Sequence, residues 1–345
     1  MTITCPVPLV TTDKVLLGHG SGGKLSAELM RSVFLPAFQN PILDRMDDQA
    51  ILSMNRARIA FTTDSFVVKP LFFHGGDIGS LSVHGTVNDL AMGGAVPMFL
   101  SAAFIIEEGF SMEALRKIVT SLGQAAEACG VQVVTGDTKV VDRGSGDGVF
   151  INTTGLGLVP DGVCLSASQA RPGDAVILSG SIGEHGIAIL AEREGLEFDG
   201  AIESDSAPLH NLVADMLAAA SGIRVLRDPT RGGLSSALNE IAQQARVGIH
   251  IDERAIPVRE EVRGACEMLG LDPMYVANEG KLVAIVAASA AQNALYALES
   301  HPLGKDAVII GRVTADHPRM VVMRTPFGTT RIVDMLSGDQ LPRIC

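Results

Sequence analysis

One break in the pattern of strands and helices, near residues 160–174, divides this chain into two halves. Residues 160–162 (Pro-Asp-Gly) and 171–174 (Arg-Pro-Gly-Asp) form turns, and strand-like and helix-like segments occur on both sides of them. A chain of 345 residues is too long for one small hydrophobic core, so two domains are expected. We place them at residues 1–165 and 166–336, and a polar tail that reads as mobile follows at 337–345.

Both halves mix β-branched strand segments with helical segments, which predicts an α/β fold for each domain. In the first half the pattern predicts strands at 58–68, 98–106, 131–134 and 149–159, a turn at 135–138, and helices at 25–34, 78–92 and 112–129. In the second half it predicts strands at 175–178, 281–287 and 307–313, a Gly-rich turn at 179–186, and helices at 234–245 and 258–269.

The charge and cysteine content exclude several classes of protein. The formal net charge of −12, without a long basic run, argues against a nucleic-acid or membrane-surface partner. No apolar run is long enough to cross a bilayer, and the start of the chain lacks the pattern of a secretion signal. Five cysteines without CxxC spacing suit a reducing cytoplasm. A polyanionic ligand would need Mg²⁺ and backbone N–H groups for its binding.

Aspartates in the first half occur beside Gly, Thr or Asn, near the expected ends of strands and helices. Mg²⁺ prefers such hard oxygen ligands and usually bridges them to phosphate. The candidate metal ligands are Asp47, Asp48, Asp64, Asp89 and Asp137. The alternative for each is an ordinary helix cap or turn. Asp64 is the strongest candidate, because it interrupts an apolar strand and a buried carboxylate needs a partner.

A glycine-rich loop near the N-terminus is a candidate phosphate-binding loop. Its backbone N–H groups and its lysine would contact the anion closely. The residues concerned are Gly18, Gly20, Gly22, Gly23 and Lys24. The spacing differs from that of a Walker A loop, and a flexible surface loop is the alternative.

Three further side chains are candidates for catalysis. Lys139 follows a buried strand and would serve as a point charge or a general base; an ordinary surface lysine is the alternative. Arg231 belongs to residues 228–233 (Asp-Pro-Thr-Arg-Gly-Gly), which precede a helix and form either an anion site or a capping turn. Glu279 stands directly before an apolar strand. His84 and His185 are expected to be structural.

Cys345 is the last residue of the chain. In a polar tail it is not expected to pack in a core. The tail would instead carry its thiol to more than one site. Its α-carboxylate disfavours the thiolate, and Arg343 partly compensates. The alternative is a chance cysteine at a frayed end. The contexts of Cys129, Cys164 and Cys266 are those of small core residues.

Six motifs, in this order, resemble the ATP-binding superfamily of aminoimidazole ribonucleotide synthetase, selenophosphate synthetase and thiamin-monophosphate kinase. They lie at residues 18–24, 46–50 (Met-Asp-Asp-Gln-Ala), 62–64 (Thr-Thr-Asp), 87–94 (Val-Asn-Asp-Leu-Ala-Met-Gly-Gly), 135–138 (Thr-Gly-Asp-Thr) and 228–233. The resemblance covers most of the chain. It implies a two-domain synthetase-like fold, in which the N-terminal domain forms a barrel-like β core in a homodimer and binds ATP and Mg²⁺. It assigns the metal to the five aspartates and phosphate contacts to the glycine-rich loop, Asn88, Asp89, Gly136, Asp137 and Thr138.

The C-terminal residues 342–345 (Pro-Arg-Ile-Cys) resemble those of the carbamoyl dehydratases of nickel–iron hydrogenase maturation. This resemblance implies that Cys345 receives a carbamoyl group from the carbamoyltransferase HypF. ATP-dependent dehydration to a thiocyanate would follow, with Glu279 or Lys139 as base, and the cyano group would pass to the HypC–HypD complex. The alternatives are a small-molecule kinase or synthetase of the same superfamily, with an incidental Cys345, and a non-catalytic carrier controlled by nucleotide.

Overall fold

The first domain is built on a five-stranded sheet with the strand order β1-β2-β7-β5-β6. The structure, a computed structural model, describes residues 14–20, 23–38, 40–55, 57–196, 202–338, 341 and 343–345. The strands are β1 (Ala50–Met54), β2 (Ala57–Phe66), β5 (Val96–Glu107), β6 (Gln132–Val141) and β7 (Val149–Leu158). All neighbours pair antiparallel except β5 and β6, which are parallel because helix α4 (Met112–Ala128) crosses between them. A short hairpin, β3 (Phe72–Phe73) and β4 (Gly76–Asp77), lies beside this sheet.

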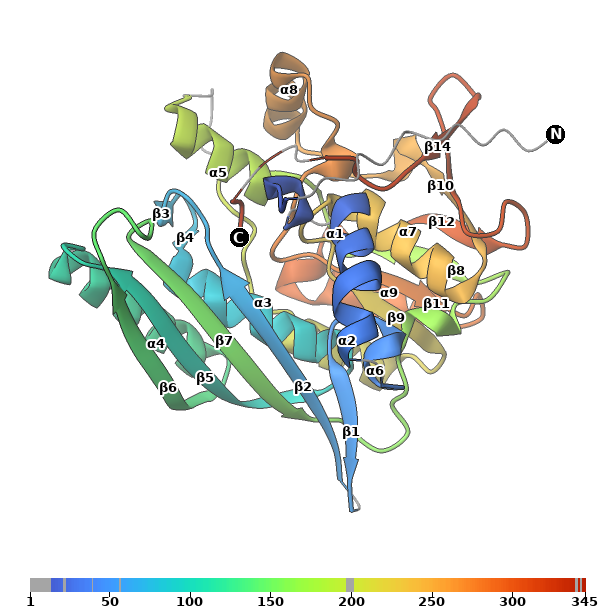
Figure 1. Ribbon diagram of the computed structural model, residues 1–345. Coiled ribbons are helices and arrows are strands. Elements are labelled where there is room, and N and C mark those ends of the chain that lie inside the picture. The colour runs from blue at the N-terminus through green and yellow to red at the C-terminus, as the bar shows by residue number, and fades with distance from the viewer. Residues whose placement is uncertain are drawn as a thin grey trace.

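Two helices cover one face of this sheet (Figure 1). Helix α3 (Ile78–Met92) begins at Asp77, whose carboxylate accepts hydrogen bonds from the first-turn N–H groups of Gly79 and Ser80. Along β7, every second side chain is buried, which is the pattern of a strand with one face against helices. The sheet is open in the single chain, with β1 and β6 at its edges, so the barrel-like dimeric core stays a prediction.

The second domain is a sheet of seven strands in the order β14-β13-β10-β12-β8-β11-β9. Its strands are β8 (Ala175–Leu178), β9 (Ile223–Arg227), β10 (Gly248–Asp252), β11 (Val283–Val286), β12 (Val308–Thr314), β13 (Val321–Arg324) and β14 (Thr330–Val333). Helix α7 (Gly233–Ala245) packs on one face, and α6 (His210–Ala219) and α9 (Ala291–Ser300) pack on the other. Two more helices, α5 (Glu184–Glu194) and α8 (Glu260–Leu269), contact each other beside the sheet.

The two domains share part of their hydrophobic core. Ala91 and Met92 at the end of α3 pack with Leu209 and Leu212 of the second domain. A helical segment before the first sheet also reaches the second domain; it consists of α1 (Lys24–Leu29), a π-helical turn (Met30–Phe34) and α2 (Leu35–Phe38). Within the described residues, no helix is long and apolar enough to cross a membrane.

The segments with clear periodicity were predicted within a few residues, and the other differences are as follows. Strand β6 continues through residues 135–138, where a turn was predicted, because these residues pair with β5. Helix α5 begins at Glu184, inside the predicted turn at 179–186. Several short elements were not predicted at all: β1, β9, β10, β13, β14, α6 and α9.

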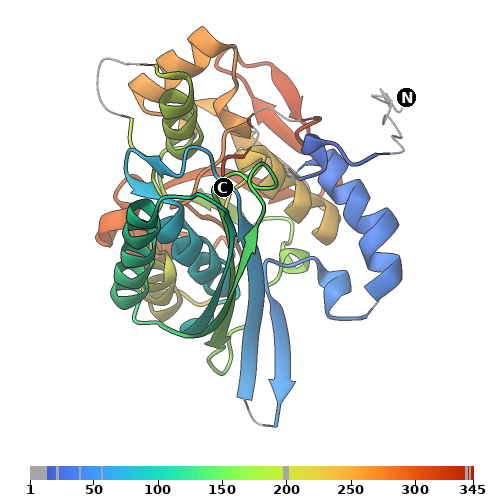
Figure 2. The same ribbon diagram turned by 60° about the vertical axis from the view of Figure 1, so that its left-hand side comes forward.

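The end of the chain is docked between the domains and does not project into solvent (Figure 2). Ile344 and Cys345 are 3% and 8% exposed and belong to a hydrophobic cluster with Phe66, Val68 and Phe73. The expectation that Cys345 lies outside the packed core is therefore wrong for this conformation, because a complementary apolar surface receives the last two residues.

Candidate active site

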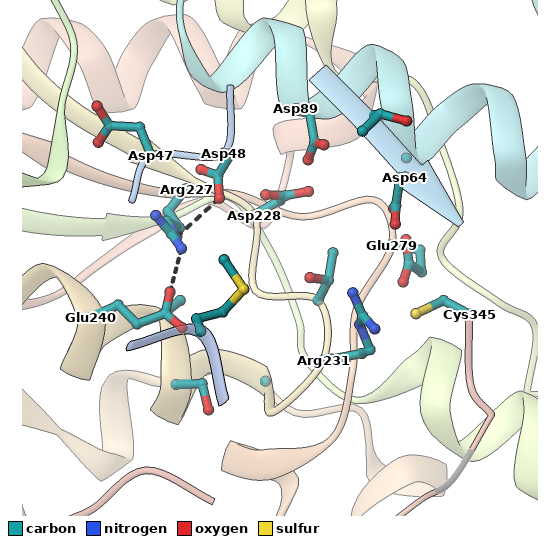
Figure 3. A pocket seen from close by; sticks show the side chains of 17 residues that line it. Asp47, Asp48, Asp64, Asp89, Arg227, Asp228, Arg231, Glu240, Glu279 and Cys345 are labelled. Atoms are coloured by element: carbon teal, nitrogen blue, oxygen red, sulfur yellow. Dashed lines mark hydrogen bonds and ion pairs between the residues drawn. The ribbon is translucent and has the colours of Figure 1, made fainter. Parts of the chain in front are cut away.

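A cavity of about 420 Å³ lies where the two domains meet, and its wall is unusually rich in carboxylates (Figure 3). The segment before β1 contributes Asp47 and Asp48, β2 contributes Asp64, and α3 contributes Asp89. From the second domain come the loop after β9, the first turns of α7 and the loop before β11; their acidic side chains are Asp228, Glu240 and Glu279. The cavity is also lined by two arginines, Arg227 and Arg231, and by the terminal Cys345.

Burial and mutual repulsion make the acidic side chains of the cavity hard to ionise. Burial raises the pKa of Asp48 to about 8, although Arg227 opposes this shift. Burial likewise raises the pKa of Asp228 to about 6, and the charge of Asp64 adds to it. The pKa values of Asp89 and Glu279 also lie well above their ordinary range, through burial first and nearby carboxylates second. The cavity therefore disfavours ionised carboxylates unless a cation is bound among them.

Arg227 is the internal counter-charge on one side of the cavity. Its guanidinium pairs with Asp48, at 3.2 Å from Nε to Oδ1, and with Glu240. It also donates to the carbonyl oxygen of Met46 at 3.2 Å. Arg227 thus fixes the segment that carries Asp47 and Asp48 against α7. Asp47 itself accepts hydrogen bonds from Ser166 and Ala167, and burial is the main reason that its pKa is raised.

Cys345 stands at the opposite side, beside Arg231, Glu279 and Asp64 (Figure 3). Burial raises the pKa of its thiol well above the ordinary value; Arg231 opposes this shift, and a hydrogen bond with Glu279 adds to it. The docked thiol is therefore protonated at neutral pH and is a weak nucleophile. A group that is already attached to this sulfur would lie within the acidic cavity.

Backbone contacts hold the last residues of the chain in place. The N–H of Val67 donates to an α-carboxylate oxygen of Cys345 at 3.1 Å, and the N–H of Lys69 donates to the carbonyl oxygen of Arg343 at 3.2 Å. The side chain of Arg343 pairs with Asp147 and donates to the carbonyl oxygen of Val67. The tail thus pairs with the chain just after β2, the strand that carries Asp64.

The structure brings many of the predicted site residues together around this cavity. They are Asp47, Asp48, Asp64, Asp89, Arg231, Glu279 and Cys345. Arg231 also links the predicted phosphate loop to the site, because its Nη1 donates to the carbonyl oxygen of Gly20 at 2.8 Å.

Four predicted residues of strand β6 lie outside the cavity in the single chain: Gly136, Asp137, Thr138 and Lys139. Asp137 and Lys139 are exposed and pair with each other at 2.7 Å. A Cβ atom on Gly136 would collide with the carbonyl oxygen of Ala102, so the close approach of β5 explains this glycine. The predicted turn at residues 135–138 is wrong, because β6 continues through Asp137 along the sheet edge; the role of Asp137 as a metal ligand stays a prediction.

The described residues of the glycine-rich loop contact the second domain. Gly18 lies in a short 3₁₀ turn, and the ammonium of Lys24 pairs with Asp334. Gly23 has a φ of 91°, and a Cβ atom there would collide with the carbonyl oxygen of Leu336. Gly22 lies outside the described residues. In this conformation Asp334 competes for the charge of Lys24, and contact of Lys24 with a phosphate stays a prediction.

Asn88 bridges the two domains instead of lining the cavity. Its amide nitrogen donates to the carbonyl oxygens of Ala207 and Glu279, and its oxygen accepts from the N–H of Leu209 at 2.7 Å. These bonds use the donors and the acceptor of the buried amide. Asn88 thus positions the backbone of Glu279, and the prediction that it contacts phosphate is not supported.

The acidic side chains fit Mg²⁺ as donors, although no three of them form a ready-made metal site. No group of three or more His, Cys, Asp or Glu among the described residues is arranged to hold a metal ion. Mg²⁺ is commonly held by one or two carboxylates together with phosphate oxygens, which does not require such a group. One oxygen of Glu279, Oε1, is buried without a hydrogen-bond partner, as expected where a charged or donating group is to bind.

Sequence reasoning did not single out Arg227 and Glu240 and did not place Asp228 among the metal ligands. Arg227 is the last residue of β9 and Asp228 directly follows it, so both lie at a strand end facing the cavity. Recognition of the short strand β9 was the signal needed for these two residues. Glu240 on α7 had no local signal.

Comparisons with known proteins agree with this architecture. Residues 46–159 match the family model described as AIR synthase related protein, N-terminal domain, and residues 171–323 match the corresponding C-terminal domain. The two sheets and the cavity between them are thus those of an AIR synthase-related protein.

Similarity over nearly the whole chain narrows the class further. Carbamoyl dehydratase HypE of Cupriavidus necator is 58% identical over 337 residues, which cover 97% of this chain and 96% of that protein. A solved HypE–HypF complex contains a chain that is 50% identical, with a TM-score of 0.85, over 89% of this chain and 99% of that one. A solved HypE in complex with ATP is 49% identical, with a TM-score of 0.82, over 96% and 100%. The chain belongs to the HypE family of carbamoyl dehydratases.

Proposed function

We propose that this chain is an ATP-dependent dehydratase that converts a carbamoyl group on the sulfur of Cys345 into a thiocyanate. The observation that carries the proposal is the position of the terminal thiol, buried in the wall of an acidic cavity beside Arg231 and Glu279. The related proteins are named carbamoyl dehydratases, and one of them was solved in complex with ATP. A nucleotide in this cavity and a carbamoyl group on this sulfur would be neighbours.

ATP would enter the cavity as a magnesium complex. The residues that would hold Mg²⁺ are Asp48, Asp64, Asp89 and Asp228, which come from both domains. When bound, the metal would neutralise charge on the phosphates and on the carboxylates around them. Cys345, Asp64 and Glu279 raise the pKa of Arg231, although burial opposes the shift, so this arginine stays charged and available to a phosphoryl oxygen.

The first chemical step activates a poor leaving group. The carbonyl oxygen of the carbamoyl group attacks the γ-phosphorus of ATP, the bond from this phosphorus to the bridging oxygen breaks, and ADP leaves. The carbamoyl nitrogen loses one proton, which gives an S-bound imidate with a phosphorylated oxygen. Arg231 lies beside the sulfur and would stabilise the negative charge that develops on the transferring group.

The second step removes the activated oxygen. The C=NH nitrogen of the imidate loses its remaining proton, the C–O bond breaks, phosphate leaves, and S–C≡N remains. Glu279 is the better placed of the two predicted bases, because it contacts the thiol while Lys139 lies on the edge strand β6 paired with Asp137. A carboxylate whose pKa is raised by burial is a stronger base once it is ionised.

The two rival functions predict different behaviour of the chain end. A small-molecule kinase of this fold would not need Cys345, yet the structure buries this residue in the cavity wall. A non-catalytic carrier would bind nucleotide and present the tail without consuming ATP. Dependence of ATP consumption on a carbamoylated Cys345 separates the proposal from both.

The proposal includes three partners. A buried Cys345 does not accept a carbamoyl group, so the tail would leave the cavity to meet its donor, HypF, and again to meet its acceptor, the HypC–HypD complex. A solved relative in complex with HypF supports the first of these partners. A second copy of the chain, packed against the open sheet of the first domain, would complete a homodimer.

Two alanine variants test the proposal. The carbamoylated wild-type protein is mixed with ATP, and released phosphate and thiocyanate are counted per chain. Cys345→Ala should bind ATP but form neither product. Cys164→Ala removes an exposed thiol that does not line the cavity, and this variant should match the wild type. Thiocyanate formation by Cys345→Ala would overturn the proposal.

A further inference from the structure

The buried side of the docked tail contacts one histidine that does not line the cavity. His185, in the first turn of α5, is fully buried, and its Nε2 lies 2.9 Å from the carbonyl oxygen of Ile344. Its ring packs edge-on against Phe73, with the centroids 5.7 Å apart. A carbonyl oxygen only accepts, so Nε2 carries the proton and donates to it.

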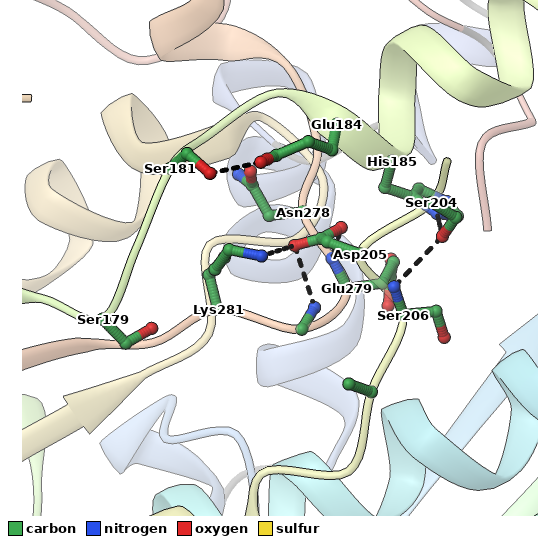
Figure 4. Close-up of polar contacts among 12 residues, drawn as sticks. Ser179, Ser181, Glu184, His185, Ser204, Asp205, Ser206, Asn278, Glu279 and Lys281 are labelled. Carbon is green, nitrogen blue, oxygen red and sulfur yellow. Dashed lines mark hydrogen bonds and ion pairs between the residues drawn. The ribbon is translucent and has the colours of Figure 1, made fainter. Parts of the chain in front are cut away.

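The second ring nitrogen fixes this tautomer. Nδ1 lies 2.7 Å from Oγ of Ser204, so the hydroxyl donates to Nδ1 and the imidazole is neutral (Figure 4). Burial lowers the pKa of His185, while Asp205 and the bond to Ile344 oppose the shift. Ser204 in turn accepts a hydrogen bond from the N–H of Ser206 at 3.1 Å. The histidine is thus neutral and donates to the tail through Nε2.

The same short segment also holds Glu279 (Figure 4). The carboxylate of Asp205 accepts from the N–H groups of Glu279 at 3.0 Å and Gly280 at 3.2 Å, and from the ammonium of Lys281 at 3.0 Å. Asp205 and Lys281 are both largely buried, so this pair is well shielded from solvent. Residues 204–206 therefore contact, on one side, the histidine that binds the tail and, on the other, the backbone of Glu279.

We infer that His185, oriented by Ser204, is a positioning residue that holds the terminal peptide docked and aligns the sulfur of Cys345 with Glu279 through residues 204–206. This inference deepens the proposed function and rests on it for the catalytic consequence. Without the donor on His185, the buried carbonyl group of Ile344 loses its hydrogen bond to this ring, and the docked state is weakened relative to the open one. The open population is expected to rise about 5- to 150-fold.

Thiol alkylation measures the open population without any carbamoyl chemistry. At low reagent concentration, where opening is faster than labelling, the alkylation rate of Cys345 is proportional to the fraction of open chains. The exposed Cys164 in the same tube is an internal reference. Peptide mass spectrometry of the full-length protein gives both rates, so a change in reagent is recognised from Cys164, and a change in global stability is recognised from the buried Cys129.

Three variants decide the inference. His185→Phe keeps a ring but removes the donor, and Cys345 should be alkylated about 5- to 150-fold faster relative to Cys164. His185→Gln keeps an N–H near the position of Nε2, so its alkylation rate of Cys345 relative to Cys164 should stay within a few-fold of that of the wild type. An unchanged ratio in His185→Phe, or an equal increase in His185→Gln, would overturn the inference. If His185→Phe does not fold, Ser204→Ala decides: a faster rate supports the inference, and an unchanged rate refutes it.

The catalytic part is read separately. With carbamoylated protein and ATP, His185→Phe should lose dehydration rate as its docked fraction falls, with an unchanged Kd for ATP, and His185→Gln should restore the rate. If the wild type performs no dehydration while His185→Phe still exposes Cys345, the proposed function fails and the contact between His185 and the tail stands. If dehydration is normal in His185→Phe despite an exposed Cys345, alignment through His185 is refuted and the proposed function stands.

Discussion

Substitution of Asp228 by Asn should stabilise the ligand-free protein, and the gain should depend on pH. Burial, Asp64 and Glu240 raise the pKa of Asp228 from 3.8 to about 6, against the opposing effect of Arg227. A carboxylate with such a raised pKa costs the folded state about 3 kcal/mol once it is ionised. Asn keeps the shape of the side chain and removes the charge.

The sign of the pH dependence follows from the direction of the shift. Below pH 4 Asp228 is protonated in both the folded and the unfolded chain, so the variant and the wild type should be similarly stable. Between pH 4 and about 6 the unfolded chain loses this proton first, which progressively destabilises the folded wild type. Above pH 6 the full difference is present, and it should persist to pH 8.

Thermal unfolding without nucleotide or divalent cations measures this difference. For a domain of about 150–250 residues, a difference of about 3 kcal/mol raises the Tm by about 6 to 12 °C, which is the shift expected for Asp228→Asn at pH 7.5. At pH 4 the Tm values of the variant and the wild type should differ little. Asp142→Asn, which removes a charge from an exposed turn, is the matched control and should change neither value. Equal Tm values for Asp228→Asn and wild type at pH 7.5 would refute the claim that the cavity stores electrostatic repulsion.

Three further substitutions test other parts of the site. Glu279→Gln should slow dehydration by about 10²- to 10⁴-fold and leave ATP binding intact, as measured by single-turnover phosphate release and calorimetry; full-speed turnover would remove Glu279 from the role of base. Asp147→Asn removes the ion pair of Arg343 and should raise the alkylation rate of Cys345 about two- to five-fold, since the pair is partly exposed; a constant rate would show that this ion pair does not hold the tail. Gly136→Ala should lower the free energy of unfolding by about 1–3 kcal/mol through a collision with β5; an unchanged free energy in urea titration would contradict this structural role.

The regular segments of the fold were accessible from the sequence because they carry their own signals. Helix α3 has an Asp cap before it and two glycines after it, and α4 has a Ser cap and ends close to Gly130. Strand β7 alternates between buried and exposed side chains. Asp64 was recognised as unusual because a carboxylate within an apolar strand requires compensation, and the structure places it in the cavity.

Other features depend on contacts between residues far apart in the chain. Residues 135–138 have turn-like composition, yet pairing with β5 keeps them in a strand. Strand β9 pairs with β11 and strand β13 pairs with β10, both from distant segments, and these strands of five and four residues carry too little local pattern to be predicted. Lys24 is drawn to Asp334, more than 300 residues away in the sequence, and no local motif predicts that partner.

The docking of the tail is the least predictable part. Residues 343–345 have no periodic pattern, and a terminal segment is ordinarily exposed. Its binding surface is assembled from the chain after β2, the first turn of α5 and residues near 277, which are all distant in sequence. The sequence identified Cys345 as chemically important, but only the packed structure shows which side chains surround its sulfur.

The fate of the carbamoyl oxygen tests most directly whether ATP dehydrates the group on Cys345. Cys345 is loaded by HypF with a carbamoyl group whose oxygen is heavy oxygen, and ATP is then added. If this oxygen attacks the γ-phosphorus, the label should appear in the released inorganic phosphate, one labelled oxygen per thiocyanate formed. Recovery of the label in water or in ADP, with none in phosphate, would contradict the account.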